Sequence, residues 1–250
     1  MAVARVRVDC MKRKRQPDRR DNRSARQREI AVLYEDDAVI AIDKPAGLPA
    51  VPVAKNAKTS SAWSLVAAEL RARRERVFVV HRIDRFTSGI MLFAKTERNR
   101  DALVRQFLEH TPVREYIAVV RGHVEPAEGT LVHYFRKEGH LQKLSSPRDK
   151  QAARAELHYR VEQKLRDASV VRVALVTGLQ NQIRVQFSVI GHPVIGDRKY
   201  KPEEAKERRI DRVALHAARL EFIHPRTGQA VSINSEIPAD LKSLVKGLAR

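Results

Sequence analysis

The sequence predicts an α+β fold built on a largely antiparallel sheet, and three observations support this prediction. Strand-like segments outnumber helical ones, and the two kinds do not alternate in a regular strand–helix–strand rhythm. Hydrophobic residues make up 43% of the 250 residues, enough for the core of one large domain. No apolar stretch approaches the ~18 residues of a membrane span, so we expect no membrane partner.

Nine short segments have the apolar and β-branched content of strands. They comprise residues 31–34, 39–43, 77–80, 90–94, 116–120, 155–161, 170–176, 183–189 and 220–223. The first two form a predicted hairpin about Asp36 and Asp37, after which Pro45 and Gly47 break the chain. The proline-containing stretch 49–56 is predicted to be a loop.

Two helices are expected where a capping residue precedes an apolar stripe. Ser60 or Ser61 can cap a helix that ends at Arg74, and Thr96 can cap one that ends at His110. We expect both stripes to pack in the core, and they consist of Leu65, Val66 and Leu70 in the first helix and of Leu103, Phe107 and Leu108 in the second. The charged residues 199–209 are predicted to form a solvated loop or a short helix.

The chain is strongly basic. It holds 49 Lys and Arg against 30 Asp and Glu, which gives a net charge of +19 and a pI near 10.6. Such an excess is typical of proteins with a polyanionic partner, most often a nucleic acid. The alternative is a soluble basic protein without such a partner.

Part of this charge lies in residues 1–28, which hold eleven Arg and Lys and three Asp. The segment has almost no hydrophobic run after Val8, so we predict a disordered basic tail followed by one folded domain over residues 29–250. It lacks the apolar core of about 7–15 residues that marks a secretory signal, and its aspartates argue against a transit peptide. Cys10 is the only cysteine, which excludes an internal disulfide and fits a reducing cytosol. We expect a cytoplasmic protein that acts as a monomer.

The most informative stretch is His81-Arg82-Ile83-Asp84, which runs into Thr87-Ser88-Gly89. It joins two apolar runs, so a lone carboxylate lies in a short polar turn between two strands that we expect to be buried. Charged side chains are costly there unless they are paired or functional, and perturbed carboxylates often mark active sites. The alternative is a polar hairpin in which Asp84 hydrogen-bonds to the backbone.

The stretch from Val77 to Thr96 resembles the signature of the RluA-type RNA pseudouridine synthases, with Ile83 in place of the usual Leu. Six further blocks occur in the family's order, and together the blocks cover roughly residues 32–230. They are Val32–Asp37 with Asp43–Leu48, Arg114–Ala118, Thr177–Arg184, Gly191–Asp197, Leu215–Ala217 and His224–Gly228. The resemblance implies the pseudouridine-synthase fold, a mixed and mostly antiparallel central sheet flanked by helices and loops, with residues 29–250 as the catalytic domain.

The resemblance also implies an isomerisation of a specific uridine in rRNA or tRNA. The N1–C1′ glycosidic bond is broken, the uracil turns, and the ring is rejoined through C5. Nothing is oxidised and no group enters or leaves, so no cofactor is expected. One carboxylate near the sugar or the ring suffices, whereas glycosidases use two across the bond, and no second acid lies in a comparable motif.

Three residues receive catalytic roles from the resemblance. Asp84 is the catalytic carboxylate, which either attacks carbon or takes a proton from the ribose. Tyr116 lies against the flipped uracil and accepts or relays the C5 proton. Arg184 pairs with Asp84, and an opposite charge within about 4–6 Å favours the ionised carboxylate. Without these blocks, Tyr116 would be interpreted as a core-facing strand residue and Arg184 as an exposed one.

Three further residues are candidates for contact with RNA. A target uridine must leave its stack, and Arg82 resembles the family position that contacts RNA there. His81 either touches the phosphate backbone or makes a local hydrogen bond. The family pattern Thr-Gly-Arg-x-His-Gln-Ile-Arg is altered, because Leu179 and Asn181 replace the arginine and the histidine. Asn181 can still donate a hydrogen bond, whereas Leu179 cannot bind a phosphate.

Neither a metal site nor a nucleotide cofactor is expected. The nine histidines show no ligand spacing, and no P-loop or Rossmann glycine pattern occurs. Two other functions fit the charge, a non-catalytic RNA-binding protein or RNA chaperone on the same scaffold and a ribosomal structural protein. The first has no reason to retain Asp84, Tyr116 and Arg184 together, and the second leaves the carboxylate turn unexplained. An RNA pseudouridine synthase is therefore the preferred hypothesis.

Overall fold

The computed structural model describes residues 5–6, 30–52, 60–139, 141–200 and 209–250. The strands are β1 (Arg5–Val6), β2 (Ile30–Glu35), β3 (Val39–Lys44), β4 (Phe78–Val79), β5 (Ser88–Ala94), β6 (Val113–Arg121), β7 (Glu128–Glu138), β8 (Leu141–Ser145), β9 (Ala153–Lys164), β10 (Ala168–Leu175), β11 (Leu215–Ile223) and β12 (Ala230–Asn234). The helices are α1 (Ala62–Ala72), α2 (Glu97–Leu108), α3 (Gln182–Val189) and α4 (Ala239–Leu248).

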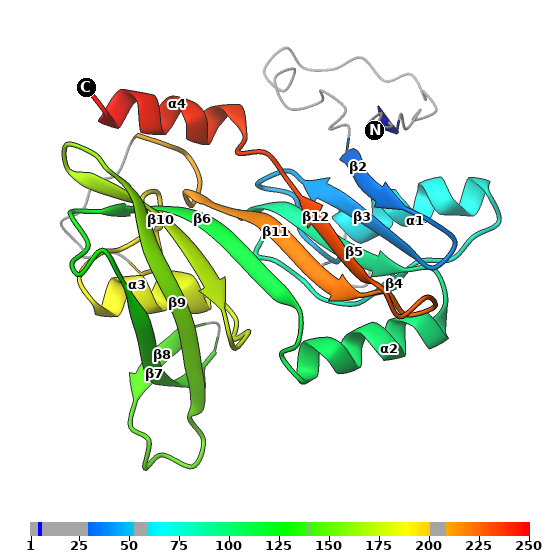
Figure 1. Ribbon diagram of the computed structural model, residues 1–250, viewed down its shortest axis with the longest axis horizontal. Coiled ribbons are helices and arrows are strands. Elements are labelled where there is room, and N and C mark those ends of the chain that lie inside the picture. Colours follow the sequence, from blue (N-terminus) through cyan, green and yellow to red (C-terminus); the bar gives the residue numbers. More distant parts are fainter. Residues whose placement is uncertain (1–4, 7–29, 53–59, 140, 201–208) are drawn as a thin grey trace, which may run out of the picture.

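In the described ranges these strands form one sheet (Figure 1). The hydrogen-bonded path runs β1-β2-β3-β5-β11-β6-β10-β9-β7-β8, with β12 beside β11 and β4 beside β5. Within that sheet β5 and β11 pair in parallel, and the neighbours of each on its other side are antiparallel. The predicted α+β class and the mixed, mostly antiparallel sheet are confirmed.

The two predicted helices form where their capping residues lie. The Ser61 hydroxyl accepts a hydrogen bond from the Ser64 backbone N–H at the start of α1, and the Thr96 hydroxyl accepts one from Asn99 at the start of α2. Each bond satisfies a donor that the first helical turn leaves unpaired. The apolar stripes pack inward except at Leu108, which is 74% exposed at the last position of α2.

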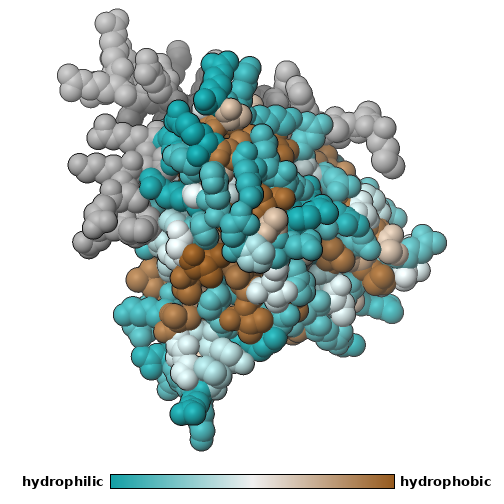
Figure 2. All heavy atoms as spheres, turned by 60° about the vertical axis from the view of Figure 1, so that its left-hand side comes forward, coloured by the Kyte–Doolittle hydropathy of each residue, from teal (hydrophilic) through white to brown (hydrophobic). Residues whose placement is uncertain are grey.

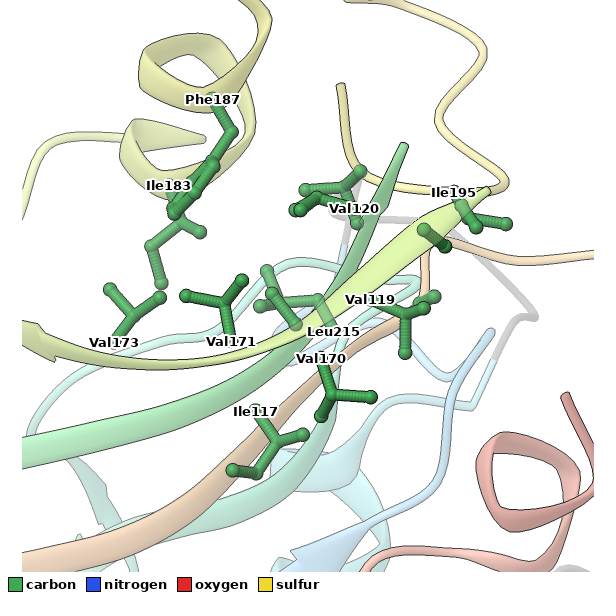
Figure 3. Packing of buried hydrophobic residues seen from close by; sticks show 14 of the residues in the cluster. Ile117, Val119, Val120, Val170, Val171, Val173, Ile183, Phe187, Ile195 and Leu215 are labelled. Atoms are coloured by element: carbon green, nitrogen blue, oxygen red, sulfur yellow. The ribbon is translucent and has the colours of Figure 1, made fainter. Parts of the chain in front are cut away.

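Residues 183–189 were predicted as a strand, and that prediction is wrong because they form most of helix α3. Apolar residues alternate there with polar ones, but the helix is enclosed on two sides, so both sides carry apolar side chains. Figure 3 shows Ile183 and Phe187 pointing from α3 toward the sheet, where they join the core with Val171 and Val173 of β10. Val185 packs instead against Phe135 and Ala155. Tertiary packing therefore overrides the period-two pattern.

The sequence patterns also missed β7, β8, β12 and α4. Strands β7 and β8 extend the sheet beyond β9 at one end of the molecule (Figure 1). Figure 2 brings this end forward and shows a mostly hydrophilic surface with apolar residues in separate patches. The leucines of α4, at 241, 244 and 248, are buried in the same core as Val171 and Val173.

Strand β5 follows the signature turn and passes very close to β11. Gly89 has φ +109, and a Cβ added there would lie 2.2 Å from the carbonyl oxygen of Ala217. Only glycine fits this crossing, which explains why the signature ends in glycine. The crossing fixes the start of β5, and with it the turn that carries Asp84.

The basic tail predicted over residues 1–28 lies outside the described residues except at Arg5 and Val6. These two pair with β2 in an antiparallel register, Arg5 opposite Ala31 and Val6 opposite Ile30. The charged segment predicted over 199–209 is described only at Lys199, Tyr200 and Arg209.

Candidate active site

A pocket of about 270 Å³ lies between the signature turn, β6 and the start of α3. Five of the six predicted site residues line it, namely Arg82, Asp84, Tyr116, Asn181 and Arg184. Its apolar lining includes Ile83, Leu175 and Leu215. Residues that are more than a hundred positions apart in the sequence therefore share one cavity.

The turn that carries Asp84 is held from outside by the block around Lys44. The Arg85 carbonyl accepts hydrogen bonds from the Gly47 N–H at 2.7 Å and from Lys44 Nζ at 3.2 Å. Arg85 Nε donates in return to the Gly47 carbonyl at 3.0 Å. Lys44 is completely buried and also donates to the carbonyls of Pro45 and Leu48. Its positioning role was missed, although the block itself was recognised.

Arg184 lies in the first turn of α3 and bridges two carboxylates. Its Nη1 donates to Asp84 Oδ2 at 3.2 Å, while Nε and Nη2 donate to the two oxygens of Asp197 at 2.6 and 2.8 Å. Burial opposes the charged form, but the hydrogen bonds and charges of Asp197 and Asp84 outweigh it and raise the pKa of Arg184. The predicted pair of Asp84 and Arg184 is thus present in the structure.

Sequence reasoning also missed the role of Asp197, although it recognised the block that this residue closes. Its side chain has no exposed surface, and besides the two bonds from Arg184 it accepts the backbone N–H groups of Lys199 and Tyr200. Burial alone would raise the pKa of Asp197, but these hydrogen bonds hold it below its usual range. A signal was available, because an aspartate closing an apolar block at residues 191–197 needs a cationic partner if it is buried.

Tyr116 projects from β6 into the pocket. Burial raises the pKa of Tyr116 to about 12, the charge of Asp84 adds to the increase, and Arg114 opposes it. The hydroxyl is therefore protonated at neutral pH. Among the described residues no group hydrogen-bonds to this hydroxyl, which leaves it able to contact a uracil ring.

Asn181 is oriented toward the protein's own groups. It stands at the N-cap of α3 with φ 58, and its Oδ1 accepts a hydrogen bond from Arg184 Nη1 at 2.7 Å. Its Nδ2 donates to the Tyr200 hydroxyl at 3.3 Å. The side chain, which we predicted to contact RNA, thus aims Arg184 at Asp84. Leu179 packs against the small apolar cluster around Phe135.

His81 and Arg82 differ sharply although they are adjacent. His81 Nε2 accepts the Leu92 N–H at 3.0 Å, and its ring stacks on Phe107 with 4.6 Å between centroids. Burial lowers the pKa of His81 to about 3, so the ring is neutral. The hydrogen-bond partner of His81 thus lies on β5, eleven positions along the chain, and not within the turn itself. Arg82 is exposed on the pocket and has no partner in the described part of the chain.

Two kinds of feature are absent from the described residues. No group of three or more His, Cys, Asp and Glu in these ranges could hold a metal ion. No helix among them is long and apolar enough to cross a membrane.

Comparisons with known proteins agree with this site. The model of the RNA pseudouridylate synthase family matches residues 38–189. The chain is 34% identical over 230 residues to the ribosomal large subunit pseudouridine synthase D of Zymomonas mobilis, covering 88% of this chain and 73% of that protein. It is 34% identical over 205 residues to the dual-specificity RNA pseudouridine synthase RluA of Vibrio vulnificus, covering 78% of each.

A solved structure supports the fold independently. The human RNA pseudouridylate synthase domain containing 4 superposes with a TM-score of 0.72 at 21% identity, covering 87% of this chain and 92% of that one. The family match spans more than half of the chain and includes the signature turn, β6 and α3, which together build the pocket. The chain therefore belongs to the RNA pseudouridine synthase family of isomerases.

Proposed function

We propose that this enzyme converts a specific uridine of ribosomal RNA or tRNA to pseudouridine with Asp84 as its catalytic carboxylate. One observation carries the proposal: Asp84, Tyr116 and Arg184 line a single pocket, with Arg184 Nη1 3.2 Å from Asp84. The name of the Zymomonas relative, a ribosomal large subunit enzyme, supports ribosomal RNA as a substrate.

The three side chains divide the work. Asp84 is 26% exposed, so it can reach either C1′ or a ribose proton once the flipped nucleotide enters the pocket. Arg184 keeps this carboxylate ionised and oriented. After C5 has bonded to C1′, the C5–H electron pair forms the C5=C6 bond, N1 takes up a proton, and Tyr116 accepts or relays the proton that C5 loses. Arg82, exposed at the pocket, contacts the RNA that surrounds the flipped base.

Mapping pseudouridines across total RNA tests the proposal and names the substrate. RNA from a strain that lacks the gene is compared with RNA from its parent and from the same strain carrying the gene again. We expect one or a few sites to vanish and then return. An unchanged map, under conditions in which the parent makes the protein, would contradict the proposal.

We infer further that the protein works as a monomer, because residues of a single chain complete the pocket. A cytoplasmic location is part of the same inference, because a sequence with one cysteine, Cys10, fits a reducing compartment. Sedimentation of the purified protein should give a mass near 28.5 kDa. A stable dimer would contradict the inference.

A further inference from the structure

Arg114 lies directly behind the active-site pocket. It stands two positions before Tyr116 on β6, so the two side chains leave the strand on the same face. Its Nη2 donates to the carbonyls of Val176 at 2.9 Å and Thr177 at 3.3 Å. These carbonyls immediately precede Gly178, which lines the pocket. Arg114 therefore holds the backbone that leads into the pocket wall at Gly178.

The charge of Arg114 is not neutralised by a carboxylate. The residue is 9% exposed, its Nε is buried without a hydrogen-bond partner, and no acid pairs with it among the described residues. The neighbouring arginines differ from Arg114 because each forms an ion pair. Arg184 pairs with Asp84 and Asp197, and Arg172 and Arg219 both pair with Glu115. A buried unpaired charge is strongly unfavourable, and such charges concentrate at functional sites.

The pocket group on which this charge acts is Tyr116. Burial and the carboxylate of Asp84 both disfavour negative charge on the Tyr116 oxygen, and Arg114 is the cation that favours it. Arg184 is less available for this purpose, since Asp197 and Asp84 already share its charge. A protonated hydroxyl can relay the C5 proton only as its own proton leaves, and the oxygen then carries transient negative charge that such a cation compensates.

The pocket wall passes so close to Arg114 that only a glycine fits without a shift. A Cβ added to Gly178 would lie 2.5 Å from Arg114 Nη1. The atom in conflict is the end of a flexible side chain, so an alanine there would displace the guanidinium and leave the backbone in place. The close contact thus offers a way to move the charge without removing it.

We propose that Arg114 is a positioning residue for the proton-transfer step. It stabilises the negative charge that develops on the Tyr116 oxygen when its hydroxyl proton passes to water ahead of the arriving C5 proton. It also holds the backbone of residues 176–178 against the pocket. The proposal rests on the role proposed above for Tyr116.

A double-mutant cycle tests whether Arg114 acts through Tyr116. Single-turnover rates of pseudouridine formation are measured at saturating protein, on a transcript that spans the mapped uridine. Arg114→Gln should slow the reaction by about a hundredfold, the lower end of the range for one lost electrostatic contact in a transition state. In a Tyr116→Phe background the same substitution should change the rate by less than about twofold. Additive effects would overturn the proposal.

Three companion variants separate charge from fold. Arg114→Lys keeps the charge and should recover most of the rate, whereas equal losses in Lys and Gln variants would indicate a merely structural role. Arg219→Gln removes a paired arginine from the opposite face of the same strand pair and should leave the rate unchanged. If Arg114→Gln does not fold, Gly178→Ala replaces it in the cycle, and a rate equal to the parent's would overturn the proposal.

The same experiment separates this proposal from the one on which it rests. If Tyr116→Phe has the parental rate, the role of Tyr116 fails and that of Arg114 fails with it. If Tyr116→Phe is slow while Arg114→Gln is not, only the role of Arg114 is refuted.

Discussion

The two carboxylates that share Arg184 lie in contrasting regions. Asp197 has no exposed side-chain surface, receives two hydrogen bonds from Arg184 and two more from backbone N–H groups. Asp84 sits in a turn at the pocket, is 26% exposed, and receives one hydrogen bond from Arg184 at 3.2 Å. Asp197 is thus fully satisfied, whereas Asp84 retains lone pairs for another partner.

This difference indicates that the two carboxylates have separate roles around one guanidinium: Asp197 positions Arg184, and Asp84 is free to react. Asp197 and Asn181 fix the orientation of Arg184 from the protein side. Nη1 of Arg184, which also donates to Asn181, then donates to Asp84. The position of Arg184 does not depend on that last hydrogen bond. A buried cation held in this way can orient a reactive carboxylate that is itself free to contact substrate.

The largest effect on turnover is expected from replacing Asp84, the carboxylate that faces the pocket. Asp84→Asn is isosteric but can act neither as nucleophile nor as base, so turnover should fall by at least about three orders of magnitude. RNA affinity should remain near that of the parent. Single-turnover assays and a binding titration on the same transcript measure both quantities. Substantial residual activity would show that another group performs the chemistry.

Replacing Asp197, the buried carboxylate, should instead destabilise the protein. Asp197→Asn leaves the buried charge of Arg184 with Asp84 alone, and we expect the free energy of unfolding in urea to fall by about 3 kcal/mol. A matched control exists in Asp167, which binds Arg209 at 2.8 and 2.9 Å in a pair whose two side chains are 52% and 29% exposed. Asp167→Asn should cost at most about 1 kcal/mol. Equal losses would refute the importance of burial.

The parent and Asp197→Asn should differ in their free energy of unfolding by an amount that depends on pH, because the pKa of Asp197 is depressed. A depressed carboxyl pKa contributes stability that is present above the unfolded value, about 3.9, and lost as pH falls through the folded value. The stability gap between the parent and Asp197→Asn should therefore stay constant from pH 7 to about 4.5 and close only below about 3.9. His81 destabilises both proteins equally as pH falls below about 6.5, because its folded pKa is about 3. A gap that closes between pH 7 and 5 would contradict this assignment.

The smallest effect on chemistry is expected from the basic segment 1–28, which lies away from the compared pair in sequence. Its deletion removes a net charge of +8, so RNA binding should weaken. Each lost phosphate contact flattens the slope of log affinity against log salt by about 0.7–0.9. The same uridine should still be modified at the parental single-turnover rate. An unchanged slope would show that the segment does not contact RNA.

The sequence predicted the residues that line the pocket better than the residues that position them. Asp84, Tyr116 and Arg184 could be found because each lies in a recognisable block, and helices capped at Ser61 and Thr96 follow local rules. The role of Lys44 depends on a contact with Arg85, 41 positions along the chain, which no local pattern encodes. The role of Asn181 depends on the helix that starts there, which was predicted as a strand. Asp197 offered only the signal of an aspartate that closes an apolar block, without naming its partner.

Helix α3 shows the same limit in secondary structure. The alternation of apolar and polar residues from Ile183 to Val189 is typical of a strand. The segment is nevertheless a helix, because it packs against apolar clusters on two sides and its apolar residues are not confined to one face. Strands β7 and β8 escaped notice for a related reason, because their alternating residues include many charged ones and no family block covers them.

The most direct test of the account is the free energy of unfolding of Asp84→Asn, measured in urea beside its RNA affinity. Because Asp197 and Asn181 already hold Arg184, the account predicts a stability within about 0.5 kcal/mol of the parent, the usual range for a residue outside a required network. The same protein should bind RNA and fail to modify it. A loss of about 3 kcal/mol, the loss expected for Asp197→Asn, would show that Arg184 depends on Asp84 for its placement. That result would contradict the separate roles of the two carboxylates.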